Sequence, residues 1–193
     1  VEKFSSLQAH KNIDQGYTQI KDEDHPLHKP ELRGYFAPQF VDVDGDADLD
    51  IISGGDYGSV VFFRNDQGAY TNEIELSPFT GIDVGGVNNQ ADAAAKLVDI
   101  DNDGDLDLFM TNDYGEIHFY KKVEDGAFVE QFLQDNPLSF AETLTGNIPF
   151  LNFTDIDHDG DLDLFFGGDS KYQRQGGLLY FENTGSKEVP VFE

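Results

Sequence analysis

The chain contains no cysteine and few basic residues. Lys and Arg number 12 against 38 Asp and Glu, so the formal net charge is −26 at pH 7. The lack of cysteine excludes disulfide bonds and thiolate metal sites. The shortage of positive charge argues against nucleic acid and anionic membranes as partners, since both bind to basic surfaces. The sequence also has no recognisable signal peptide, transmembrane run or lipidation motif.

Aromatic residues, in contrast, are abundant. An acidic composition of this kind is typical of disordered chains. However, the chain has 17 Phe and 8 Tyr, and many of them stand at the alternating spacing of β-strands. This spacing predicts a folded domain with a packed core.

One nine-residue acidic segment occurs three times, starting at Asp42, Asp99 and Asp155, with Asp at every odd position. Alternate aspartates around a Gly or small residue crowd their carboxylates inside one tight loop, where they repel one another. Ca²⁺ takes about six to eight oxygen ligands at about 2.3–2.6 Å and would remove this repulsion. We therefore predict three calcium ions. The candidate metal residues are Asp42, Asp44, Asp46, Asp48, Asp50, Asp99, Asp101, Asp103, Asp105, Asp107, Asp155, Asp157, Asp159, Asp161 and Asp163.

The residues after each loop distinguish it from an EF-hand. An EF-hand needs a bidentate Glu at loop position twelve and a helix after it. Position twelve here is Ser53, Met110 or Phe166, within short apolar runs that are typical of strands. Position nine is thus the expected last side-chain ligand. A solvated hairpin tip would explain one such loop, but three copies in identical register argue against this explanation.

The loops belong to a longer repeat. Asp99 follows Asp42 by 57 residues, and Asp155 follows Asp99 by 56. In each copy we expect a strand into the loop, a strand out of it, an aromatic strand and a short closing strand. The aromatic strands are expected at 59–63, 116–120 and 177–181, and the closing strands at 68–71, 126–129 and 190–192. Four strands at this period are typical of a β-propeller blade.

The expected fold class is all-β, a propeller-like array of four-stranded antiparallel blades with three complete repeats and a partial one. Residues 1–22 are expected to be the tail of a preceding repeat, because Gly16-Tyr17-Thr18 matches a closing strand. The repeats are then 23–75, 76–133 and 134–193, in one continuous domain. A propeller usually needs about four blades to close. We therefore expect an excerpt of a longer propeller, or a chain whose sheet is completed by another chain.

These features resemble the FG-GAP/VCBS family of calcium-loop β-propeller repeats, which also occurs in the head of integrin α-subunits. The matching residues are the three acidic loops, the exit Phe165-Phe166-Gly167-Gly168, and segments 180–185 and 190–192. The resemblance implies Ca²⁺ ligands from the side chains at positions one, three, five and nine. It also implies that position seven binds through its backbone carbonyl. These carbonyls belong to Asp48, Asp105 and Asp161.

Loop position six departs from the pattern once, with Ala47 where the other loops have Gly104 and Gly160. If this position requires a positive φ, alanine costs about 1 kcal/mol or less. The first loop would then be the weakest site.

The sequence gives little support to catalysis. An ion held by so many protein oxygens has few open positions, and His10, His25, His28, His118 and His158 form no recognisable cluster. We expect a non-enzymatic, calcium-stabilised module for adhesion or for binding glycan or protein. Alternatives are an accessory or scaffold domain of a polysaccharide-degrading enzyme, and a structural subunit of an extracellular assembly.

An extracellular or cell-surface location is expected, because millimolar Ca²⁺ outside cells fills loops of modest affinity. Tyr57, Tyr114 and Tyr172 follow the second strand of each repeat at comparable places. They are candidates for stacking on sugars, or alternatively for filling the rim between blades.

Overall fold

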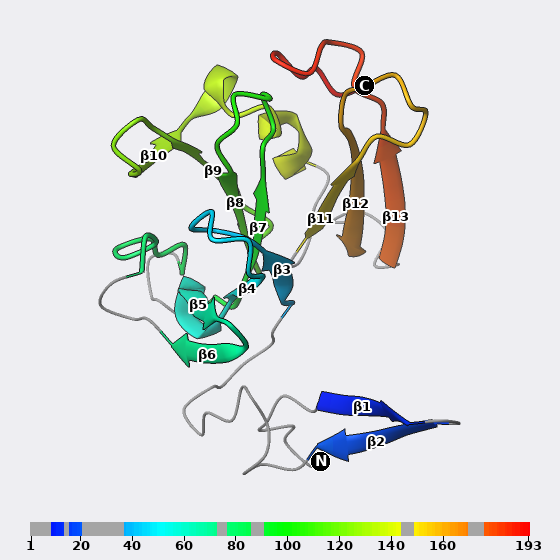
Figure 1. Cartoon of the computed structure of the whole chain (residues 1–193). Coiled ribbons are helices and arrows are strands. Elements are labelled where there is room, and N and C mark those ends of the chain that lie inside the picture. Colours follow the sequence, from blue (N-terminus) through cyan, green and yellow to red (C-terminus); the bar gives the residue numbers. More distant parts are fainter. Residues whose placement is uncertain are drawn as a thin grey trace.

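The computed structural model describes residues 9–13, 16–20, 37–72, 77–85, 91–143, 149–169 and 176–193. Among these residues the regular structure is β-strand and short 3-10 helix, with no α-helix. The prediction of an all-β fold is confirmed (Figure 1). We find no helix of membrane-spanning length and hydropathy in this described part of the chain.

Three antiparallel sheets follow one another along the chain, and in each the strands are ordered as in the sequence. The first sheet consists of β3 (Gln39–Val41), β4 (Asp50–Gly54), β5 (Val60–Asp66) and β6 (Ala69–Asn72). The second consists of β7 (Ala93–Val98), β8 (Asp107–Asn112), β9 (Ile117–Lys122) and β10 (Phe128–Gln131). The third consists of β11 (Phe150–Thr154), β12 (Asp163–Asp169) and β13 (Gly176–Phe181). The short 3-10 helices are η2 (Asp56–Gly58), η4 (Leu133–Asp135) and η5 (Ser139–Thr143).

The C-terminal residues take the place of a fourth strand in the third sheet. Asn183 and Phe192 form an antiparallel bridge. Beside it, the backbone N–H groups of Glu182 and Glu193 each donate to the other's carbonyl, at 3.1 and 3.0 Å. The closing strand expected at 190–192 therefore lies where the repeat requires it. At the other end of the chain, β1 (Ala9–Ile13) and β2 (Gly16–Ile20) form a separate hairpin.

One closing strand begins later than expected. The sequence predicts a strand at 126–129, but β10 starts at Phe128. A tight turn occupies the preceding residues: Gly126 N–H donates to the Val123 carbonyl at 2.7 Å, and Val123 N–H donates to the Ala127 carbonyl at 2.9 Å. This turn, with Gly126 at a φ of 83°, moves the strand start toward the C-terminus.

Successive side chains of the second sheet point to opposite faces, and each face packs in a different core. Leu108 belongs to a core shared with Ile52 of the first sheet. The next residue, Phe109, belongs to a second core shared with Leu164 of the third sheet. Its ring stacks on Phe119 of its own sheet, with centroids 4.6 Å apart. The middle sheet thus packs against both neighbours.

The first strands of the three sheets lie next to one another and are linked by side chains. The Gln39 amide bonds both backbone groups of Leu97, donating to its carbonyl and accepting from its N–H, each at 2.8 Å. Lys96 Nζ donates to Asn152 Oδ1 at 3.0 Å. At Gly54 a Cβ would lie 2.1 Å from the Ala93 carbonyl oxygen, so only glycine fits there. This arrangement is propeller-like, and the described residues do not close a ring.

Candidate metal centres

Each acidic loop connects the first two strands of one sheet. Loop 1 (residues 42–50) leads from β3 to β4, loop 2 (99–107) from β7 to β8, and loop 3 (155–163) from β11 to β12. The ninth residue of every loop is the first residue of the following strand. Three loops at the same place in three sheets agree with the repeat inferred from the sequence.

The three loops share one backbone path. Positions four and six have positive φ in all of them, although only some of these residues are glycine. The φ values are 79° at Gly45, 54° at Asn102 and 66° at His158 for position four, and 72° at Ala47, 93° at Gly104 and 100° at Gly160 for position six. Ala47 therefore occupies the left-handed conformation, at a cost of about 1 kcal/mol.

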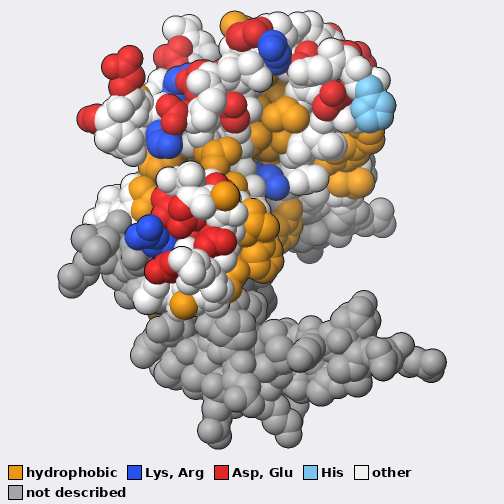
Figure 2. Space-filling model, in the orientation of Figure 1, with side chains coloured by type: hydrophobic (Ala, Val, Ile, Leu, Met, Phe, Trp, Pro, Cys, Tyr) orange, Lys and Arg blue, Asp and Glu red, His pale blue; other side chains and the backbone are white. Residues whose placement is uncertain are grey.

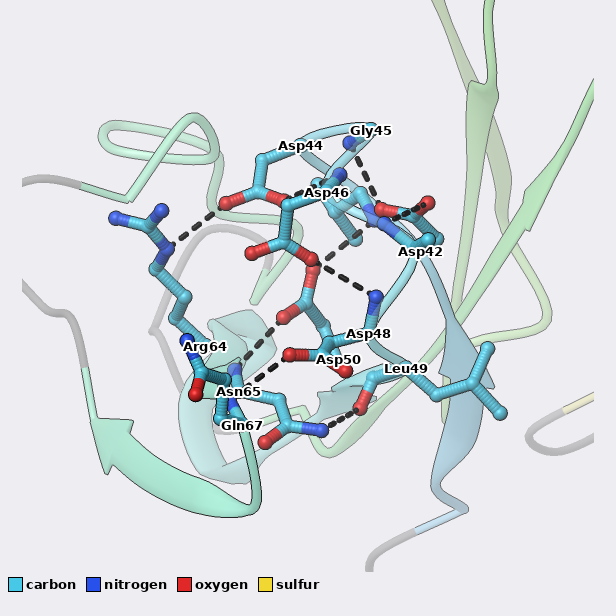
Figure 3. A network of polar contacts seen from close by, with 12 residues as sticks. Asp42, Asp44, Gly45, Asp46, Asp48, Leu49, Asp50, Arg64, Asn65 and Gln67 are labelled. Carbon is cyan, nitrogen blue, oxygen red and sulfur yellow. Dashed lines mark hydrogen bonds and ion pairs between the residues drawn. The ribbon is translucent and has the colours of Figure 1, made fainter.

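Hydrogen bonds to the first Asp close each loop. The two carboxylate oxygens of Asp42 accept from Gly45 N–H at 2.7 Å and from Ala47 N–H at 3.0 Å (Figure 3). Asp99 and Asp155 likewise accept two backbone N–H groups of their own loops. The N–H groups around each turn thus hold the first carboxylate in place, and the following carboxylates gather beside it.

Three carboxylates of each loop come together closely enough to bind one ion. In each group, one oxygen from every residue lies within 4.8 Å of the others. The groups are Asp42, Asp44 and Asp50 in loop 1; Asp99, Asp101 and Asp103 in loop 2; and Asp155, Asp157 and Asp159 in loop 3. Of the four side-chain ligands expected in each loop, the structure therefore groups three. Those outside the groups are Asp46, Asp107 and Asp163.

The ninth Asp connects the loop to the third strand of its sheet or to the residues that directly follow this strand. Asp50 is fully buried and accepts from Val43 N–H at 3.0 Å and from Asn65 N–H at 2.8 Å. Asp163 makes the equivalent pair of bonds, with Ile156 N–H at 3.2 Å and Asn183 N–H at 2.9 Å. The geometry of the loop is thereby coupled to the aromatic strand of the blade.

Asp107 differs from the other two ninth residues. It is fully buried, and its Oδ1 accepts from Lys122 N–H at 2.8 Å. Its Oδ2 is also buried and has no hydrogen-bond partner among the described residues. Burial raises the pKa of Asp107 to about 7, the Lys122 hydrogen bond opposes this, and the charge of Asp101 adds to it.

An unpartnered buried carboxylate oxygen is costly unless a cation or donor reaches it. The donor set of loop 2 consists of oxygen alone, which is the set that hard divalent cations such as Ca²⁺ and Mg²⁺ prefer. A divalent cation in this loop would favour the charged form of Asp107. The residues present therefore fit such an ion.

The comparison with protein families points to the same part of the chain. Residues 99–166 match the model described as an FG-GAP-like repeat. This part of the chain is similar to an FG-GAP-like repeat. A search of the curated proteins gave no match. The FG-GAP-like match begins at the first Asp of loop 2 and extends beyond loop 3 into β12. Loop 1 lies outside it but has the same positive-φ pattern.

The seventh Asp of the loop bonds to residues outside the carboxylate group in two of the three loops. Asp48 Oδ2 accepts from Gln67 N–H at 2.8 Å, and Asp105 Oδ1 pairs with Lys122 Nζ at 2.9 Å. Their side chains bond the hairpin that follows. In loop 3, burial raises the pKa of Asp161, and the neighbouring carboxylates, first Asp159, raise it further.

Two basic side chains reach into the carboxylate groups, and the sequence alone gave no reason to select them. Arg64 Nε lies 2.8 Å from Asp44 Oδ2 (Figure 3). Lys121 Nζ contacts Asp101 and lies 3.2 Å from Asp103 Oδ2. The pKa of Asp103 is lowered by the Asp105 backbone hydrogen bond, with a further contribution from Lys121. Figure 2 shows Lys and Arg side chains beside some of the acidic groups of this face.

The signal that could have identified Arg64 and Lys121 is their position in the repeat. Each immediately precedes the residue whose N–H binds the ninth Asp, Asn65 in one sheet and Lys122 in the next. A residue next to the N–H donor of this hydrogen bond lies close to the loop, whichever amino acid it is. A basic residue at this place is therefore positioned to reach the acidic group.

Proposed function

We propose that the chain is a calcium-stabilised FG-GAP-like repeat module that works outside the cell as a binding or adhesion domain. The observation that carries the proposal is the grouping of three carboxylates in each of three matching loops. The unpartnered oxygen of fully buried Asp107 adds an independent reason for a cation in loop 2.

Calcium suits these loops better than magnesium. Each loop offers five aspartates within nine residues, together with backbone carbonyls. Ca²⁺ accepts many protein oxygens in flexible geometry, whereas Mg²⁺ keeps several of its waters and uses few carboxylates. Millimolar extracellular Ca²⁺ would fill such loops even at modest affinity.

The role proposed for calcium is structural rather than catalytic. The ion would neutralise the loop between the first two strands. Through the ninth Asp it would also stabilise the third strand of the first two sheets, because Asp50 and Asp107 accept from Asn65 N–H in β5 and Lys122 N–H in β9. Three of the four strands in a blade are thus held by one loop, and the connections between blades keep a fixed shape for recognition.

Two exposed tyrosines are the proposed contacts for a glycan or protein ligand. Tyr57 is 61% exposed and Tyr114 is 55% exposed, so neither is packed between sheets as rim filling. Exposed aromatic rings stack on apolar faces of ligands. Tyr172 lies outside the described residues. We expect a glycan array to show binding that is lost in the double variant Tyr57→Ala with Tyr114→Ala, and unchanged binding would exclude these rings as contacts.

Calorimetry on chelator-treated protein tests the calcium proposal directly. We expect three Ca²⁺ per chain, one for each loop, because the loops share backbone path and acid spacing. A stoichiometry of zero or one would overturn the proposal. Mg²⁺ at the same concentration is the matched control and is expected to bind much more weakly.

A pair of Asp→Asn variants in loop 2 tests the assignment of ligands. Both remove one negative charge, so a difference between them reports the ligand role. Asp103→Asn changes a member of the carboxylate group and is expected to weaken one calcium site by about tenfold or more. Asp105→Asn keeps the backbone carbonyl and is expected to have a much smaller effect. Equal losses of calcium affinity would contradict the assignment.

A further inference from the structure

One position, in or directly after the third strand, differs in charge among the three sheets. It directly precedes the residue whose N–H binds the ninth Asp, namely Asn65, Lys122 or Asn183. This preceding residue is Arg64 in the first sheet and Lys121 in the second. In the third it is Glu182, which has the opposite charge.

The two basic residues bind the oxygens that a cation in the loop would need. Arg64 pairs with Asp44, and Lys121 pairs with Asp101; both acids stand at loop position three and belong to the carboxylate groups. Lys121 Nζ also lies 3.2 Å from Asp103 Oδ2. Asp103 belongs to the same loop 2 group, together with Asp99 and Asp101. These ion pairs must be broken or displaced for an ion to take the same oxygens.

Loop 3 has no such counter-charge among the described residues. No ion pair joins its aspartates to a described Lys or Arg side chain. The charges therefore form a graded series. Loop 2 pairs with two lysines, Lys121 and Lys122. Loop 1 pairs with Arg64. In the third sheet the residue at the matching place is Glu182, which is negative.

We propose that Arg64 and Lys121 are built-in counter-cations that compete with Ca²⁺ for loops 1 and 2. Loop 3, which has Glu182 at the matching place, fills first and most tightly, followed by loop 1 and then loop 2. Ala47 does not make loop 1 the weakest site, because it already has its positive φ of 72° in the folded loop. This inference rests on the proposed calcium function. It makes the module respond in steps: at low Ca²⁺ loop 3 is filled while the other two loops are held by the chain's own cations, and they load only as Ca²⁺ rises.

Glycine amide signals allow each loop to be followed separately in the full chain. Gly104 N–H bonds Asp99 and Gly160 N–H bonds Asp155, so both report on the first carboxylate of their loops. Gly45 N–H reports in the same way on Asp42. In ¹H–¹⁵N spectra of chelator-treated protein titrated with CaCl₂, we expect Gly160 to shift first, then Gly45, then Gly104.

Charge variants then test the cause of that order. Lys121→Gln is expected to tighten Ca²⁺ at loop 2 by about fivefold, the factor for an exposed ion pair of ~1 kcal/mol. Glu182→Gln is expected to weaken loop 3 by a similar factor. Lys121→Arg keeps the charge and should leave loop 2 near its original affinity. Lys187→Gln removes a lysine that pairs with Glu188 instead, and it controls for net charge alone.

The outcomes separate this inference from the calcium proposal. If no loop glycine shifts up to millimolar CaCl₂, the calcium function itself fails. If all three loops bind but Lys121→Gln leaves loop 2 unchanged, or loop 3 does not fill first, only the counter-cation inference is overturned. Should Lys121→Gln fail to fold without Ca²⁺, Glu182→Gln decides the question, because it removes a repulsive charge and its effect on loop 3 has a predicted sign.

Discussion

Removal of Ca²⁺ by EDTA is expected to lower the melting temperature of the chain by many degrees. Each emptied loop leaves five aspartates within nine residues, and their mutual repulsion favours the unfolded chain. A site filled at 100 times its Kd contributes about 2.7 kcal/mol. In a chain of this size that corresponds to roughly 5–11 °C for each loop. Thermal unfolding followed by circular dichroism measures the change.

The matched control for this experiment is EDTA neutralised by excess CaCl₂, which should restore the original melting curve. Excess MgCl₂ should restore it only in part. A melting temperature that EDTA leaves unmoved would count against structural calcium. The stability lost on calcium removal should also differ among the loops, because Arg64 and Lys121 partly replace the ion in two of them.

The second large effect is expected from the core between the second and third sheets. Phe109 is fully buried, its ring stacks on Phe119, and it lies 5.2 Å from the Phe153 ring of β11. Phe109→Ala would leave a cavity that the neighbouring sheets cannot fill without losing other contacts. The free energy of unfolding should fall by about 3–5 kcal/mol. Urea unfolding in saturating CaCl₂ measures it independently of the loops.

Phe132→Ala provides the matched control, since it makes the same change at a side chain that is 64% exposed. It should alter the free energy of unfolding by about 0.5 kcal/mol or less. If both variants destabilise the chain equally, Phe109 does not form the centre of the core described above.

The sequence predicted the fold class and the place of the loops because both depend on short-range patterns. Short apolar runs define β4, β8 and β12, and the acidic spacing defines the turn before each strand. The positive φ at position six was also accessible, since two of the three loops have glycine there. These features need only neighbouring residues and the preferences of the backbone.

The roles of Lys121 and Asp107 needed the structure. Lys121 reaches Asp101 across 20 residues of chain, and that contact depends on how β9 pairs with β8. The missing partner of Asp107 Oδ2 depends on whether a backbone N–H comes within reach, as Val43 N–H does for Asp50. The loops have nearly the same sequence, so the spacing of their residues does not predict which backbone N–H groups come within hydrogen-bond distance of the ninth Asp.

The double burial of the second sheet makes the three sheets unequal as units of local unfolding. Opening of the first sheet exposes the core that contains Ile52 and its own small cluster of Ile51 and Phe63, and opening of the third exposes the core that contains Leu164. Opening of the second sheet exposes both of the cores that the sheets share, the one with Ile52 and the one with Leu164. A repeat that packs against two neighbours opens at a higher free energy than one that shares a single core. Among the described sheets the second, with Leu108 and Phe109 on opposite faces, is therefore the last to admit solvent.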